Sequence, residues 1–170
     1  MQAMASWIVD DGPMDQLARV VPLDEVASWP KGQFFVAEAT RRNASGKRRE
    51  LLACDPDIFR TCEIAVGSEA ADILYGHLRL PREPIANEAE YQAIAWAMTE
   101  RKDAVLVTLD KRAAMLALAE LGRGRVAHAF DLWLHLRDGG LITETQFAAI
   151  CEATRRNDHG LPDIPLRCKR

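Results

Sequence analysis

The chain has 170 residues, of which 48% are hydrophobic and 28% charged, and its formal net charge is −3. These values favour a single globular domain over residues 1–170, and they give no overall electrostatic attraction to nucleic acid. No apolar run approaches the ~20 residues that span a bilayer, and the opening Met-Gln-Ala-Met-Ala-Ser lacks the charged and apolar parts of a secretory signal. We therefore expect a cytoplasmic protein that has no membrane partner.

Short apolar runs alternate with segments of helical periodicity along the chain. The expected strands cover residues 6–10, 33–36, 62–66, 104–108 and 126–129. The expected helices cover residues 13–21, 23–28, 37–43, 48–54, 70–78, 91–101, 111–121, 130–137 and 144–155. This alternation predicts a central, mainly parallel sheet with helices on both faces, which is a three-layer α/β/α, Rossmann-like fold.

Two helix starts have recognisable signals. Pro13 follows Gly12 and is expected at the first helical position, where its missing N–H costs nothing. Asn87 and Glu90 have the spacing of a capping box, in which each side chain bonds the backbone N–H of the other residue.

Three carboxylates stand at element boundaries far apart in the chain. Asp10 ends the first expected strand, Asp110 follows the strand over 104–108, and Glu90 opens a helix. Each has a simpler explanation, because Asp forms turns and caps and Glu90 fits the capping box. Together they predict a site for Mg²⁺ or Mn²⁺, hard ions that prefer oxygen ligands. Asp11 is expected to face away from this site.

Positive charge is concentrated in two segments. The first carries Arg41, Arg42, Lys47, Arg48 and Arg49 without an intervening acid. The second carries Arg155, Arg156, Arg167, Lys169 and Arg170. Both fit solvated surfaces, and both equally fit a basic border that holds nucleic-acid phosphates beside an acidic centre.

The remaining polar and aromatic candidates have weaker signals. Thr108 is interpreted either as an ordinary strand residue or as a hydroxyl that orients a carboxylate or a phosphate. The histidines lack zinc or dyad spacing, the cysteines lack close pairs, and the tryptophans are expected in the core. These residues are His77, His128, His135 and His159; Cys54, Cys62, Cys151 and Cys168; and Trp7, Trp29, Trp96 and Trp133.

Four segments together resemble PIN domains. Residues 7–18 (WIVDDGPMDQLA) are similar to the family's opening strand, its terminal Asp and the Pro-led helix that follows. Residues 89–97 (AEYQAIAWA) resemble its Gly-Glu-x-x-Ala-Ile-x-x-Ala helix start, and 106–114 (LVTLDKRAA) resemble its Thr-x-Asp-Arg strand end. Residues 130–142 (FDLWLHLRDGGLI) are similar to a closing helix and turn of one PIN subgroup.

The resemblance implies a Mg²⁺- or Mn²⁺-dependent endoribonuclease for single-stranded RNA, often the VapC-type toxin of a toxin–antitoxin pair. It assigns metal binding to Asp10, Glu90 and Asp110, and places a further acid at Asp131. It also implies an antitoxin partner and a homodimer. Cleavage would proceed by attack of a metal-activated water on phosphorus, and the basic residues at 41–49 would hold the RNA backbone.

One departure from the family pattern leaves a second interpretation open. PIN domains usually place another Glu in the helix after the second strand, and that position falls on Asn43, with Glu38 about one turn earlier. A neutral amide attracts a cation less than a carboxylate does. The chain is therefore either an active nuclease or a catalytically impaired PIN-like scaffold that binds a protein or RNA partner.

A phosphoacceptor receiver domain is a remote third interpretation. It is suggested by the adjacent Asp10 and Asp11, by Thr108 at a strand end and by the nearby Lys111. It is opposed by Asp55, which has no convincing strand before it.

Overall fold

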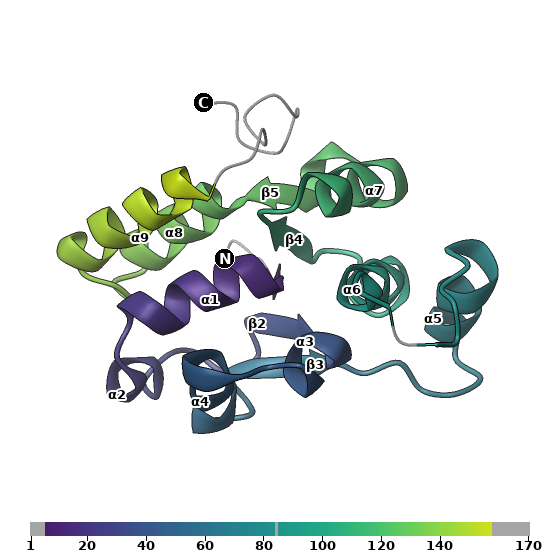
Figure 1. Cartoon of the computed structure of the whole chain (residues 1–170), viewed down its shortest axis with the longest axis horizontal. Helices are drawn as coiled ribbons and strands as arrows, with labels where there is room; N and C mark the ends of the chain where they lie inside the picture. Colours follow the sequence, from purple (N-terminus) through teal and green to yellow (C-terminus); the bar gives the residue numbers. More distant parts are fainter. Residues whose placement is uncertain (1–5, 84, 158–170) are drawn as a thin grey trace.

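The computed structural model describes residues 6–83 and 85–157. At its centre is a sheet of five parallel strands in the order β3-β2-β1-β4-β5 (Figure 1). The strands are β1 (Trp7–Val9), β2 (Phe34–Ala37), β3 (Phe59–Cys62), β4 (Val105–Thr108) and β5 (Val126–His128).

Helices connect successive strands and cover both faces of the sheet. The α-helices are α1 (Asp11–Val20), α2 (Leu23–Val26), α3 (Glu38–Arg42), α4 (Gly46–Cys54), α5 (Glu69–Asp72), α6 (Glu88–Thr99), α7 (Lys111–Leu121), α8 (Ala129–Asp138) and α9 (Glu144–Arg156). A π-helical turn, η1 (Ile73–His77), and a 3₁₀ turn, η2 (Arg123–Arg125), complete the elements of the described residues. The predicted three-layer α/β/α fold is confirmed.

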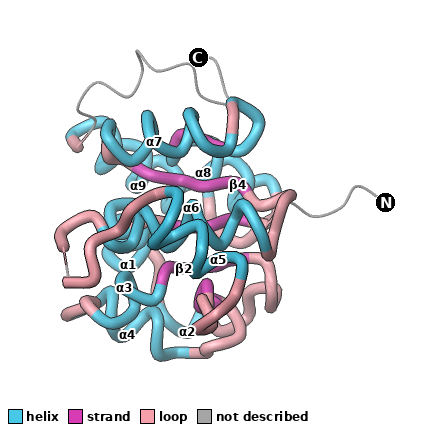
Figure 2. Tube along the Cα trace, turned by 90° about the vertical axis from the view of Figure 1, so that its right-hand side faces the viewer, coloured by secondary structure: helices cyan, strands magenta, loops and turns pink. Residues whose placement is uncertain are grey.

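The two faces of the sheet have separate cores, because successive strand residues point to opposite sides. On one face, Val9 and Val107 pack with Met14 of α1 and with residues of α4, α8 and α9. On the other face, Ile8 and Leu106 pack with residues of α6 and α7. Figure 2 views the molecule from the side of α5, α6 and α7, with the strands as an inner layer. The four tryptophans lie in or against these cores, as predicted: Trp7, Trp29, Trp96 and Trp133.

The third strand was predicted in the wrong place. It covers Phe59–Cys62 rather than 62–66, because Phe59 pairs with Phe34 of β2 and both Phe59 and Cys62 are fully buried. Val66, which gave the expected strand its alternation, is wholly exposed in a loop. The pattern over 62–66 therefore reflected loop composition and not a buried strand.

Three local helix predictions also need correction. The segment expected as one helix over 70–78 is α5 followed by the π-helical turn η1. Pro13 occupies the third position of α1, because the helix already begins at Asp11. Asn87 precedes α6 but its side chain makes no capping hydrogen bond, so the predicted capping box with Glu90 is wrong.

The strand order places a crevice between β1 and β4. From β1 the chain proceeds to β2 and β3 on one side of the sheet, and it then returns to β4 and β5 on the other side. In open parallel sheets, ligands bind at the carboxyl ends of the strands where the order reverses. This position therefore selects the residues that follow β1 and β4 as candidates for function.

Within the described parts of the chain, no helix has the length and apolar character needed to cross a membrane. Cys54 and Cys62 are free thiols, Cys151 is buried, and Cys168 lies outside the described residues.

Candidate functional site

An acidic pocket lies at the carboxyl ends of β1 and β4, where the strand order reverses. It has a volume of about 430 Å³. Its acidic lining consists of Asp10, Asp11, Asp15, Glu90 and Asp110. The structure thus brings the three acids singled out in the sequence to one cavity, although they come from segments widely separated along the chain.

Thr108, the last residue of β4, links two of these acids. Its hydroxyl donates a hydrogen bond to Oδ2 of Asp10 at 2.7 Å, and Oγ1 of Thr108 accepts one from the backbone N–H of Asp110 at 3.0 Å. Thr108 is fully buried. Of its two interpretations, the structure supports the one in which the hydroxyl orients a carboxylate.

Helix capping explains only one of the three acids. Asp110 caps α7, since its Oδ1 accepts the backbone N–H of Ala113 at 2.9 Å. Asp10 stands at the start of α1 but its side chain makes no capping bond, and Glu90 has no capping-box partner. Neither Asp10 nor Glu90 therefore makes a side-chain capping hydrogen bond, although both stand at helix N-termini, where negative charge is favourable.

Burial and mutual repulsion disfavour the charged forms of two pocket acids. Burial raises the pKa of Asp10 to about 6, with Asp11 and Asp110 adding repulsion and the hydrogen bond from Thr108 opposing the rise. Burial also raises the pKa of Glu90 to about 7, with further repulsion from Asp10 and Asp110 and an opposing attraction from Arg112. Carboxylates that repel one another across a shared cavity provide a favourable environment for a cation.

Helix α1 brings further charged groups that the sequence reasoning missed. Asp11 was expected to face away, yet it lines the pocket together with Asp15 and Arg19. Their spacing of four residues puts them on one helical face, and this periodicity was the signal available in the sequence. Arg48 of α4 pairs with Oδ1 of Asp11 at 3.8 Å and with Oδ1 of Asp15 at 3.4 Å.

The wall opposite the strands is held by a buried polar contact between helices. Nε1 of Trp133 in α8 donates to Oγ1 of Thr154 in α9 at 2.8 Å. Oγ1 of Thr154 also lies 2.7 Å from Oε1 of Gln16 in α1. Since Gln16 and the α9 residues Ala153 and Asn157 line the pocket, this contact fixes the wall relative to the acids.

Most of the basic residues proposed to hold RNA are engaged within the protein. Arg48 bonds the acids of α1, Arg42 pairs with Glu88 at 2.6 Å, and Nε of Arg49 donates to the carbonyl of Ala44. Lys47 is exposed. In the second basic group, Arg155 and Arg156 lie 4.0 and 3.1 Å from Glu152, while Arg167, Lys169 and Arg170 fall outside the described residues.

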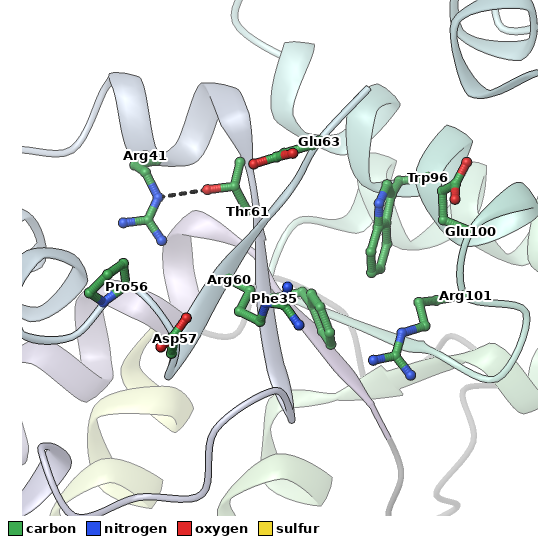
Figure 3. Close-up of a pocket in the computed structure, with 10 residues that line it drawn as sticks. All are labelled: Phe35, Arg41, Pro56, Asp57, Arg60, Thr61, Glu63, Trp96, Glu100 and Arg101. Carbon is green, nitrogen blue, oxygen red and sulfur yellow. Dashed lines mark hydrogen bonds between the residues drawn. The ribbon is translucent and has the colours of Figure 1, made fainter. Parts of the chain in front are cut away.

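Arg41 has a structural role at the edge of the sheet. Its guanidinium donates to Oγ1 of Thr61 and to the carbonyls of Leu52 and Phe59, so it joins the end of α4 to strand β3. Figure 3 shows Arg41 directed at Thr61 beside a second cavity, of about 650 Å³, that does not include the pocket acids. Partial burial lowers the pKa of Arg41.

Three further acids or amides proposed from the PIN resemblance do not line the acidic pocket. Glu38 is exposed and borders a different cavity, together with Gln92. Asn43 ends α3, and its backbone carbonyl accepts a hydrogen bond from Arg48. Asp131 occupies the third position of α8, where it completes a capping box with His128.

The histidines have structural or surface positions. His77 pairs with Glu120 at the surface, and His135 contacts the ring of Trp7. His128 caps α8, and His159 lies outside the described residues.

The donor chemistry of the pocket fits a hard divalent cation. Oδ1 of Asp11 is buried and, within the described residues, accepts no hydrogen bond, and the guanidinium of Arg48 lies 3.8 Å from it. Across the same described ranges, no three His, Cys, Asp or Glu side chains are already arranged as a metal-binding group. Mg²⁺ is commonly held by one or two carboxylates and several waters, so its binding does not require three preformed protein ligands.

Comparison with known proteins identifies no relative. No family model, no curated protein and no solved structure matches the chain. The assignment of a functional site therefore depends on the geometry and chemistry of the pocket.

The sheet topology argues against the receiver interpretation. Receiver domains such as CheY have the strand order 2-1-3-4-5, whereas this sheet has the order 3-2-1-4-5. Asp55 lies before β3 and not at its carboxyl end, so it does not occupy a strand-end position beside Asp10.

Proposed function

We propose that the chain is an endoribonuclease that cleaves single-stranded RNA with Mg²⁺ or Mn²⁺ as its cofactor. The observation that carries this proposal is the convergence of Asp10, Glu90 and Asp110 on one pocket at the reversal point of a parallel sheet. The raised pKa values of Asp10 and Glu90 support it, because perturbed carboxylates in a cleft are typical of functional sites.

The pocket residues divide into ligands and a positioning residue. Asp10, Glu90 and Asp110 would hold the cation, and Thr108 would fix the relative orientation of Asp10 and Asp110 through its two hydrogen bonds. When bound, a divalent cation lowers the pKa of a coordinated water and neutralises charge on a phosphodiester. Arg19, on the pocket wall, adds a positive charge that attracts the substrate backbone.

The preference for RNA and the toxin role rest on the resemblance to PIN domains. The same resemblance is the basis for an antitoxin partner and for a homodimer. These parts of the proposal are tested separately from hydrolysis, by comparing RNA with DNA of the same sequence and by identifying proteins encoded beside the gene.

The decisive experiment measures cleavage of a 5′-labelled single-stranded RNA with Mn²⁺, with Mg²⁺ and with EDTA. We expect cleavage only with a metal ion, and a loss of at least 100-fold in Asp10→Asn and in Asp110→Asn. Asp24→Asn is the matched control, because Asp24 is an exposed acid of α2 that does not line the pocket. Wild-type protein that fails to cleave RNA with either metal would contradict the proposal.

A catalytically impaired scaffold is the second candidate, and one observation favours it. Glu38 and Asn43, the two positions considered for an additional ligand, both lie outside the acidic pocket. If calorimetric titration with Mn²⁺ detects no binding while the protein still binds RNA, this candidate replaces the nuclease.

A further inference from the structure

A groove between α6 and α7 opens from the same carboxylate that lines the acidic pocket. This α6–α7 groove has a volume of about 430 Å³ and is lined by Glu90, Tyr91, Lys111, Arg112, Met115 and Leu116. The two helices pack against each other on one face of the sheet (Figure 1). Glu90 lines both cavities, so the groove lies directly beside the acidic pocket.

Two positively charged residues of the groove lie at the N-terminus of α7, where positive charge is unfavourable for the helix. Lys111 and Arg112 are exposed residues of the first turn of α7, which contains no acid. Cations at a helix N-terminus oppose the helix dipole, which places positive charge at the same end. The positive charge of Arg112 attracts the nearby carboxylate of Glu90. Residues that conflict with a local rule in this way are expected at functional sites.

The interior of the groove supplies apolar contact area. Met115 is a large hydrophobic residue that is 53% exposed, and Tyr91 is half-buried on the facing helix. Aromatic rings and the polarisable sulfur of Met form favourable contacts with flat aromatic groups. Cations at the mouth and an apolar interior are complementary to a nucleotide, which has an anionic phosphate and a flat base.

We propose that the α6–α7 groove binds the nucleotide adjacent to the scissile phosphate. The phosphate of this nucleotide pairs with Lys111 and Arg112, and its unpaired base lies against Tyr91 and Met115. Only an unpaired base can turn away from its strand to contact these side chains, so this subsite favours single-stranded RNA. The inference rests on the proposed nuclease function, since it assigns the substrate path of that site.

The test is fluorescence anisotropy of a labelled eight-nucleotide single-stranded RNA, recorded with EDTA at several salt concentrations so that binding is separated from cleavage. The double variant Lys111→Glu, Arg112→Glu is expected to bind at least 10-fold more weakly than the wild type. Loss of two phosphate contacts should reduce the slope of log K against log salt by about 1.4. Acids in the first turn complement the helix dipole, so this variant is expected to retain α7.

Lys102→Glu, Arg123→Glu is the control of equal charge change, because both residues are exposed and neither lines the groove or the pocket. Met115→Gln tests the base contact without adding charge or emptying a core, and it should weaken binding of normal RNA by about 10-fold. The same variant should not weaken binding of an RNA made abasic at the nucleotide concerned. An abasic RNA that loses affinity for wild-type protein and for Met115→Gln equally would contradict the assignment of the base.

The two proposals fail in different ways. The groove assignment is overturned if the double variant Lys111→Glu, Arg112→Glu binds RNA as tightly as the charge control does. The same result is expected if the groove binds a protein partner instead of RNA. Absence of RNA binding by the wild type also overturns the groove assignment. The nuclease proposal depends instead on metal-dependent cleavage by the wild type, which these binding measurements do not involve.

Discussion

At the scale of single residues, Thr108 has the most direct control over the geometry of the acidic pocket. Its hydroxyl contacts the carboxylate of Asp10 and the backbone of Asp110. Thr108→Val keeps the branched shape and removes both hydrogen bonds, so we expect metal-dependent cleavage to fall about 10- to 100-fold, as for other groups that orient metal ligands. Rates with the labelled RNA measure this effect, and Thr108→Ser should retain most activity.

Asp10 is expected to reduce the stability of the metal-free protein at neutral pH. Its pKa is raised from 3.8 to about 6 by burial, so folding favours the protonated carboxyl. The contribution of the protonated Asp10 carboxyl to the free energy of unfolding is complete below pH 3.8 and is lost as the pH rises through about 6. We therefore expect Asp10→Asn to raise the free energy of unfolding by about 1–3 kcal/mol at pH 8 in EDTA.

Urea denaturation at pH 8 and at pH 4.5 measures this difference. At pH 4.5 the folded carboxyl is largely protonated but the unfolded one is still mostly charged, so the difference between wild type and Asp10→Asn should be clearly smaller than at pH 8 and should vanish only below pH 3.8. A variant that is less stable than the wild type at pH 8 would show that Asp10 acts mainly through its hydrogen bond with Thr108.

Sequence position was sufficient to identify Asp10 and Asp110 as site candidates, but it gave the wrong direction for Asp11. Asp10 and Asp110 follow short apolar runs, which are visible in any βα unit. Asp11 was expected to face away, but α1 begins at this residue and turns it into the pocket. The exact first residue of a helix depends on tertiary packing, so the direction of Asp11 could be inferred only from its four-residue spacing with Asp15 and Arg19.

At the scale of elements, helix α6 depends on Arg125 for its C-terminal end. The Arg125 guanidinium donates to the carbonyls of Ala97, Arg101 and Ala104 at 2.7–3.1 Å. The bond to Ala97 satisfies an acceptor that the end of α6 leaves without an intrahelical partner, and the other two hold the segment that joins α6 to β4. Arg125→Ala is expected to lower the free energy of unfolding by about 1–2 kcal/mol, measured by urea denaturation.

Arg123→Ala is the matched control for Arg125→Ala. Arg123 lies in the same 3₁₀ turn but is exposed, so its removal should change stability by less than about 0.5 kcal/mol. Equal effects of the two substitutions would assign the role to the general charge of the turn and not to the capping of α6.

Elements with strong periodicity were predicted well, and those defined by distant partners were not. Helix α7 has the predicted bounds 111–121, because Asp110 caps it and Gly122 ends it with a positive φ of 82°. Strand β3 depends on its register with β2, for which the local sequence gives no signal. The capping box at Asn87 failed because spacing alone does not specify the backbone angles that a cap requires.

At the scale of the whole molecule, strand order decides which residues meet. The alternation of strands and helices predicts a parallel sheet, but it does not state that β1 lies between β2 and β4. That neighbourhood brings Asp10 against Thr108, which is 98 positions away along the chain. The site could be proposed from three local signals, whereas its assembly required the complete topology.

A cation that binds the assembled pocket should raise the Tm of the whole protein. A ligand that binds only the folded state stabilises it by RT ln(1 + [L]/Kd), which is about 2.7 kcal/mol at 100 times Kd. A divalent cation must displace protons from Asp10 and Glu90, whose pKa values are about 6 and 7. At pH 5.5 both carboxyls are mainly protonated, and at pH 8 both are charged. We therefore expect saturating Mn²⁺ to raise Tm by several degrees at pH 8 and by much less at pH 5.5.

Thermal unfolding with Mn²⁺ and with EDTA at the two pH values measures this effect. Asp10→Asn should abolish the increase at pH 8, because it removes a proposed ligand and one of the titrating groups together. Asp24→Asn should leave the increase intact, since Asp24 lies on α2 outside the acidic pocket. An equal increase at both pH values would place the cation away from Asp10 and Glu90, because no proton would then compete with it.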